Sequence, residues 1–200
     1  PLADGRWAIV VADVSGKGVA ASLIMARLSA EARFHLALEA SPADAVARLN
    51  QCFCLERWES RFVTMILAVL YPRTHELSIV NAGHLPPLFR RSDGVIEELG
   101  RIGGAPLGID DDATFESFSH KLEPGDSVLL CSDGITDAMN DREECFGDER
   151  LTKVFGSAAA KTPAEQGRLI IQSVRSHVGN TAQIDDRCLV VFGPLRRRDA

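Results

Sequence analysis

Several features that would assign this chain to a special class are scarce or missing. No apolar run approaches the roughly 20 residues of a membrane-spanning helix, and no signal peptide opens the chain. An excess of positive charge, which general nucleic-acid binding requires, is also lacking, because the formal net charge is −6. The one basic cluster, Arg196–Arg198, is interpreted as a solvated tail. These absences predict a cytoplasmic protein without a nucleic-acid partner and without a membrane span in this segment.

A disulfide scaffold is not expected either, because the five cysteines are an odd number. Cys131 and Cys188 lie in apolar runs and are expected to be buried as small hydrophobic side chains. Cys52 and Cys54 form a Cys-x-Cys pair within a helical pattern, where two-residue spacing places them on different faces. A zinc site built from this pair is disfavoured, since zinc usually takes more ligands at wider spacing. The cysteines fit a reducing compartment.

What the sequence does contain is the composition of a globular domain, with 46% hydrophobic and 25% charged residues. Helices are predicted from Val19 to about Leu38, where Leu23 and Phe34 recur at helical spacing, then from Ser41, and from Thr162 onward to about residue 178. Strands are predicted near residues 7–12, 62–71, 76–82, 86–91, 95–99, 114–122, 125–134 and 186–192. Consecutive hairpins with helices inserted in blocks predict an α+β fold, in which helices cover antiparallel sheets.

Aspartates at the ends of predicted strands form the informative chemical pattern. Asp13 follows the first strand, Asp133 ends the strand at 125–134, and Asp185 and Asp186 begin the last strand. If these strands are neighbours, their carboxylates meet and need a cation to offset their mutual repulsion. Mg²⁺ and Mn²⁺ are hard cations that take oxygen ligands. On this pattern alone, a metal site and a set of ordinary turn residues are equally compatible.

Other catalytic motifs fit these segments poorly. A nucleotide-binding P-loop would need glycine at Val11 and Ser or Thr at Gly18, directly after Lys17. Ser132 lacks the G-x-S-x-G surroundings of a hydrolase nucleophile. His84 follows a strand in an Asn-Ala-Gly-His sequence, and either adds a polar group at the same sheet edge or is a turn residue.

Seven segments occur in a characteristic order: DVSGKGVAASLIMARL (13–28), FVTMILAVLY (62–71), NAGHLPPLF (81–89), GGAPLGI (103–109), LEPGDSVLLCSDGITDAMN (122–140), FGDERL (146–151) and IDDRCLVVF (184–192). Together they resemble the bacterial SpoIIE/RsbU-like phosphatases of the PPM group, the metal-dependent serine/threonine protein phosphatases of type 2C. The resemblance implies a four-layer α-β-β-α sandwich of two antiparallel sheets flanked by helices. It also implies that residues 1–200 are a single phosphatase domain without its N-terminal, GGD-containing strand segment and without any upstream regulatory domain.

The same resemblance implies a centre of two Mn²⁺ or Mg²⁺ ions. Asp13 matches the aspartate that bridges both metals, and Val14 matches the position whose carbonyl binds one of them. Asp133 and Asp185 match further ligands, with Asp186 as a ligand or a close neighbour. A hydroxide bridging the two ions would attack the phosphorus atom of the substrate.

The implied substrate is phosphoserine or phosphothreonine on a signalling partner, commonly a STAS-domain anti-sigma factor antagonist, and a sensor or receiver domain is implied as a fused or associated partner. The chain also departs from the family pattern. Lys17 stands where many relatives have histidine, Ser15 occupies the place of a histidine in eukaryotic type 2C enzymes, and no phosphate-binding arginine stands at the matching position. Two alternatives therefore stay open: a catalytically weak, phosphatase-like module that sequesters a signalling protein, and a small-molecule phosphohydrolase.

Overall fold

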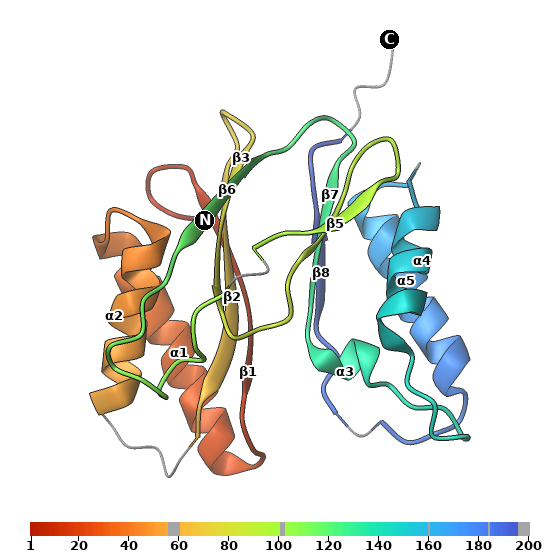
Figure 1. Cartoon of the computed structure of the whole chain (residues 1–200), viewed down its shortest axis with the longest axis horizontal. Helices are drawn as coiled ribbons and strands as arrows, with labels where there is room; N and C mark the ends of the chain where they lie inside the picture. Colours follow the sequence, from red (N-terminus) through yellow and green to blue (C-terminus); the bar gives the residue numbers. More distant parts are fainter. Residues whose placement is uncertain (56–60, 101–102, 160, 184, 196–200) are drawn as a thin grey trace. The chain divides into compact units, whose positions relative to one another are not determined.

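The computed structural model describes residues 1–55, 61–100, 103–159, 161–183 and 185–195 (Figure 1). The chain divides into two compact units: unit 1 is Pro1–Pro86 with Gly100–Lys121, and unit 2 is Pro87–Leu99 with Leu122–Ala200. Each unit contains one antiparallel sheet of four strands. The predicted fold class, two antiparallel sheets with helices, is confirmed. The Arg196–Arg198 cluster lies outside the described residues.

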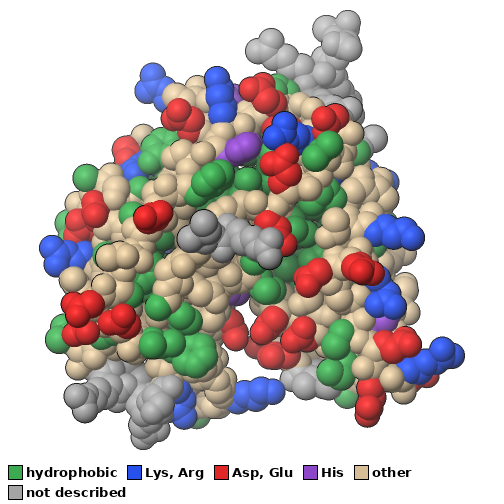
Figure 2. Space-filling model, in the orientation of Figure 1, with side chains coloured by type: hydrophobic (Ala, Val, Ile, Leu, Met, Phe, Trp, Pro, Cys, Tyr) green, Lys and Arg blue, Asp and Glu red, His purple; other side chains and the backbone are tan. Residues whose placement is uncertain are grey.

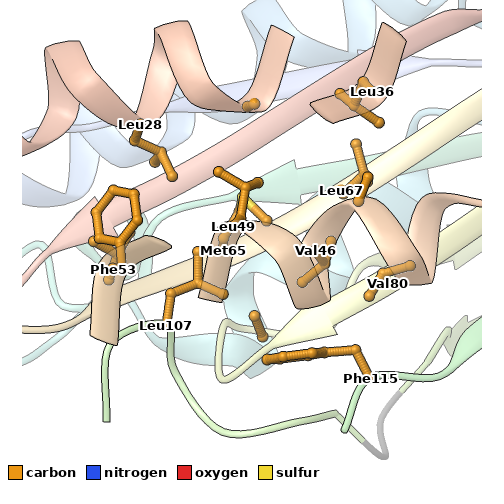
Figure 3. Close-up of a cluster of buried hydrophobic side chains, with 14 of the residues drawn as sticks. Leu28, Leu36, Val46, Leu49, Phe53, Met65, Leu67, Val80, Leu107 and Phe115 are labelled. Carbon is orange, nitrogen blue, oxygen red and sulfur yellow. The ribbon is translucent and has the colours of Figure 1, made fainter. Parts of the chain in front are cut away.

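Unit 1 is a sheet with two helices on one face. Its strands are β1 (Trp7–Val14), β2 (Val63–Tyr71), β3 (Glu76–Ala82) and β6 (Ser117–Lys121), in the order β1-β2-β3-β6. Helices α1 (Val19–Leu38) and α2 (Pro42–Leu55) pack on it through a core that includes Leu28 and Leu36 of α1, Leu49 and Phe53 of α2, and Met65 of β2 (Figure 3). Helix α2 begins where the sequence predicts, because Ser41 Oγ accepts a hydrogen bond from Asp44 N at 3.1 Å.

Helix α1 buries a different stripe from the one that Leu23 and Phe34 mark in the sequence. Those two side chains are 60% and 57% exposed, whereas Ile24, Leu28 and Ala32 are buried. Helical spacing is satisfied by both stripes, because α1 carries apolar residues on more than one side. Packing against α2 and the sheet decides which stripe becomes core.

Unit 2 also pairs a sheet with helices. Its strands are β4 (Leu88–Arg90), β5 (Ile96–Glu98), β7 (Ser127–Cys131) and β8 (Leu189–Phe192), in the order β5-β4-β7-β8. The helices are α3 (Asp133–Thr136), α4 (Gly147–Ser157) and α5 (Pro163–Val178), and α4 and α5 contribute Leu151, Phe155 and Ile170 to the core. Helix α5 opens on a capping box, in which Thr162 N donates to Glu165 Oε2 at 2.8 Å and Glu165 N donates to Thr162 Oγ1 at 3.4 Å.

Element boundaries near the predicted site differ from the sequence predictions. Strand β1 continues through Asp13 and Val14, and β8 begins only at Leu189, so Asp185 and Asp186 precede that strand rather than begin it. Cys131 is buried as expected, but Cys188 is exposed, because it lies in the segment ahead of β8. Helix α4 was not predicted from the sequence.

The described surface agrees with the charge balance of the sequence. On the face drawn in Figure 2, lysine and arginine side chains lie scattered among acidic and apolar ones, without a continuous basic patch among the described residues. None of the helices within the described ranges combines the length and the apolar character needed to cross a membrane.

Candidate metal centre

In unit 1, the predicted ligand Asp13 lies on the sheet face opposite α1 and α2. Its neighbours Ala12 and Val14 pack against the α1–α2 core, and successive side chains of a strand point to opposite faces. Asp13 is exposed and pairs in register with Thr64 of β2, while Val14 is buried and pairs with Val63. The Asp13 side chain therefore lies on the exposed face of the sheet, whereas the Val14 side chain is buried in the core of unit 1.

A small polar network adjoins Asp13 on this face. Thr64, its cross-strand partner, has Oγ1 2.9 Å from His84 Nδ1. The backbone N–H of His84 donates to Asn81 Oδ1 at 2.8 Å, and Asn81 Nδ2 donates to His84 O at 3.0 Å. The Asn-Ala-Gly-His sequence was therefore a real signal for a polar group near Asp13, whereas nothing in the sequence identified Thr64.

The turn that follows Asp13 is tied to the start of β2. Ser15 N donates to Phe62 O at 2.9 Å, and Phe62 N donates to Ser15 Oγ at 2.8 Å. Gly16 and Gly18 have φ of 94° and 85°, a region that favours glycine. These contacts give Ser15 a structural role at the position where eukaryotic enzymes of the resembled group carry histidine.

In unit 2, the structure brings Asp133 together with the Asp185–Asp186 segment. The β7–β8 ladder continues past its last strand pair, because Ser132 N donates to Cys188 O at 3.1 Å and Cys188 N donates to Ser132 Oγ at 3.1 Å. Ser132 Oγ also donates to Asp186 O at 3.2 Å. A Cβ on Gly134 would lie 2.1 Å from Asp186 O. Only glycine at residue 134 therefore permits this close approach of the two acidic segments.

The acidic side chains of unit 2 suit a hard cation. Asp133, Asp185 and Asp186 are all exposed, and the Asp133 carboxylate makes no hydrogen bond or ion pair with a described residue. Asp185 Oδ1 accepts a hydrogen bond from Asp186 N at 2.8 Å, which fixes the orientation of that carboxylate. A donor set made only of oxygen atoms fits Mg²⁺ or Mn²⁺ better than softer metals.

Thiol chemistry at the end of β7 is ruled out. Burial raises the pKa of the Cys131 thiol to about 12, so this group stays protonated at neutral pH. The neighbouring Ser132 hydroxyl is engaged by Asp186 O and Cys188 N. The carboxylates are therefore the groups at this strand end that are available for chemistry.

Comparisons with known proteins identify the family of the chain. The model of the family described as Stage II sporulation protein E (SpoIIE) matches residues 3–194. Protein IcfG of Synechocystis is 28% identical over 94% of this chain and 34% of its own length. Phosphoserine phosphatase RsbU of Bacillus subtilis is 30% identical over 66% of this chain and 40% of its own length. The chain thus spans well under half the length of these relatives.

Solved structures show the same fold. The SiaA-PP2C domain of Pseudomonas aeruginosa superimposes with a TM-score of 0.79 at 19% identity, over 94% of this chain and 80% of that one. RsbX, solved in complex with magnesium, gives a TM-score of 0.67 at 16% identity, over 96% and 82%. The fold is that of the PP2C phosphatases, and the match over residues 3–194 shows that the chain belongs to the SpoIIE family.

Proposed function

We propose that this chain is a metal-dependent protein serine/threonine phosphatase that hydrolyses phosphoserine or phosphothreonine on a signalling protein. The observation that carries the proposal is the close approach of the Gly134 and Asp186 backbones, which puts the chain segment of Asp133 next to the Asp185–Asp186 segment. Membership of the SpoIIE family and the similarity to phosphoserine phosphatase RsbU support it. In this proposal residues 1–200 act as a single phosphatase domain.

Asp13, Asp133 and Asp185 are the proposed carboxylate ligands of two Mn²⁺ or Mg²⁺ ions, with the Val14 carbonyl and Asp186 as further oxygen groups. The magnesium in the RsbX structure supports this choice of metal. Bound divalent cations supply an acidified water and offset charge on phosphoryl oxygens. The chain itself contributes the fixed positions of these ligands through the Ser15 and Ser132 hydrogen bonds described above.

Arg61 is the proposed cation for the substrate phosphate. Its Nε lies 3.5 Å from the position that a Cβ would take on Gly16, so its side chain adjoins the turn that follows Asp13. A guanidinium can donate two parallel hydrogen bonds to a phosphate. Eukaryotic type 2C enzymes bind the phosphate through an arginine, and this chain has no arginine at the matching position. Arg61 would supply that guanidinium from a different position in the sequence.

The proposed partner is a phosphorylated signalling protein, with a STAS-domain anti-sigma factor antagonist as the first candidate, and a fused or associated sensor or receiver domain would regulate the reaction in the cytoplasm. RsbU, whose name specifies phosphoserine, supports this substrate class. Removing the phosphate from a serine or threonine returns a neutral hydroxyl to the partner, and a loss of charge of this size changes which surfaces it can bind.

The test compares Asp13→Asn and Asp133→Asn with the unmodified chain, using p-nitrophenyl phosphate and a phosphoserine peptide with Mn²⁺. Mutating a residue that only supports a metal ligand typically lowers activity roughly 10–100-fold. Loss of a direct ligand should therefore lower activity by more than that range. Arg61→Ala should raise KM, whereas Arg73→Ala, on the exposed β2–β3 turn, should not. Undiminished hydrolysis by both aspartate variants would refute the ligand assignment.

Calorimetric titration with Mn²⁺ separates an enzyme from a binding module. The phosphatase proposal expects heat of binding in the unmodified chain and less in Asp133→Asn. If the unmodified chain bound no Mn²⁺ but retained a signalling partner, the sequestering module would be the correct function.

A further inference from the structure

Three side chains with metal-binding atoms converge between the two helices of unit 1. Glu31 and His35 lie one turn apart on α1, and Cys52 comes from α2. His35 Nε2 is 3.6 Å from Cys52 Sγ and 3.6 Å from Glu31 Oε2. The ligand atoms of all three residues lie within 4.8 Å of one another. We call these residues the Glu31–His35–Cys52 cluster.

The two distances from His35 Nε2 are close to those between ligands of one zinc ion. Tetrahedral zinc with ordinary bond lengths to nitrogen and sulfur places those two atoms about 3.6 Å apart, and nitrogen and oxygen ligands about 3.3 Å apart. The nitrogen–sulfur distance agrees, and the nitrogen–oxygen distance is longer by a few tenths of an ångström. That 3.6 Å nitrogen–oxygen distance is too long for a hydrogen bond.

The buried ring of His35 is poorly satisfied by hydrogen bonds, because only Nε2 has a partner, the weakly bonding Cys52 Sγ. Its side chain is buried, and its Nδ1 makes no hydrogen bond with any described residue. An unsatisfied buried polar atom is costly. The opposite ring nitrogen, Nε2, faces Cys52 and Glu31. A cation bound at Nε2 would replace the weak sulfur contact of that nitrogen with a stronger coordination bond.

The Glu31 carboxylate can serve a metal without losing its neighbour. Arg27 Nε lies 3.6 Å from Oε1 of Glu31, whereas the other oxygen, Oε2, faces His35. An arginine that pairs with the outer oxygen of a ligating carboxylate is an ordinary outer-shell arrangement.

We propose that the Glu31–His35–Cys52 cluster binds one Zn²⁺ ion, with water in the fourth position. Thiolate and imidazole select zinc over Mg²⁺ or Mn²⁺, so this site differs in metal preference from the proposed carboxylate centre. The bound ion would cross-link α1 to α2 and stabilise unit 1. The Cys-x-Cys pair is not itself the ligand set, because Cys54 Sγ lies 3.6 Å from Asn50 Oδ1 instead.

Cobalt substitution tests the site on the full chain. We expect one equivalent of Co²⁺ to give the visible bands of a tetrahedral ion and a thiolate-to-cobalt charge-transfer band, both displaced by Zn²⁺. A carboxylate centre has no thiolate and gives no such band. Cys52→Ser should abolish the charge-transfer band, and the matched control Cys54→Ser should retain it. Absence of the band in the unmodified chain, or its persistence in Cys52→Ser, would overturn the proposal.

A second variant covers the case in which Cys52→Ser fails to fold. Glu31→Gln changes a partly exposed side chain, keeps both the thiolate and the imidazole, and should weaken Zn²⁺ binding by at least about tenfold in a chelator competition. Zn²⁺ should also raise the Tm of the unmodified chain more than that of Glu31→Gln. Equal zinc affinity in the two proteins would contradict the assigned ligand set, whatever the outcome of the phosphatase assays.

Discussion

A single methyl group at residue 134 tests whether the contact between Asp133 and the Asp185–Asp186 segment controls activity. In Gly134→Ala the new Cβ would lie 2.1 Å from Asp186 O and 2.9 Å from the Asp186 carbonyl carbon. Both neighbours are backbone atoms, so no flexible side chain can move aside. The φ of Gly134 is not in the left-handed region, so the clash alone, rather than backbone strain, determines the effect.

The size of the effect follows from the overlap. A carbon–oxygen contact normally settles near 3.3 Å, so the Asp186 backbone must move by more than about 1 Å. Overpacking of this kind costs about 1–3 kcal/mol of folding free energy. A misplacement of about 1 Å at a reacting centre costs about 10²-fold in rate. We therefore expect a moderate loss of stability together with a much larger loss of phosphatase activity.

The assay is p-nitrophenyl phosphate hydrolysis with Mn²⁺, alongside urea unfolding of the same samples. Gly167→Ala is the matched control in α5, because its Cβ would meet Leu189 Cδ2 at an ordinary 3.7 Å. Alanine in a helix interior stabilises by about 0.5–1 kcal/mol relative to glycine, so this variant should keep its activity and unfold at slightly higher urea. A folded Gly134→Ala protein with unmodified activity would refute the reasoning.

Two further predictions concern stability. Asn50→Ala removes a buried amide that donates to Asp110 O at 2.7 Å and accepts from Gly108 N at 3.0 Å. Urea unfolding should show that the free energy of unfolding falls by about 1–3 kcal/mol. An unchanged unfolding midpoint would contradict this prediction. Thr162→Ala should cost about 1 kcal/mol at neutral pH. The backbone N–H and the side chain of Thr162 lower the pKa of Glu165 from 4.5, so the carboxylate's contribution is present above that value and lost as pH falls through the folded pKa. The difference between Thr162→Ala and wild type should therefore shrink in acid, and a pH-independent difference would refute a contribution from the Glu165 carboxylate.

Local signals in the sequence predicted the elements whose formation depends on neighbouring residues. Ser41 and Thr162 stand at helix starts because their hydroxyls accept from backbone N–H groups three residues on, which is a purely local bond. Strand alternation and hairpin turns are local as well, and they predicted the antiparallel sheets. The long helix α1 was predicted for the same reason.

Features that depend on long-range packing could not be read from the sequence. The buried stripe of α1 was assigned only by contact with α2 and the sheet. Thr64 became relevant because pairing of β1 with β2 placed it opposite Asp13. Glycine is required at residue 134 because of the Asp186 backbone, which lies more than fifty residues away in the sequence. The residues that face Cys52 of α2 come from α1.

The sequence by itself determined the fold class, the starts of α1, α2 and α5, and the family, because these follow from short-range bonds and from motifs in a fixed order. The tertiary structure alone decided which apolar stripe of α1 is core, that Asp133 lies beside the Asp185–Asp186 segment, and that Glu31, His35 and Cys52 meet. Each of these features depends on contacts between segments that are distant in the sequence. Because protein interiors are packed at close to crystalline density, only specific side chains fit at such contacts.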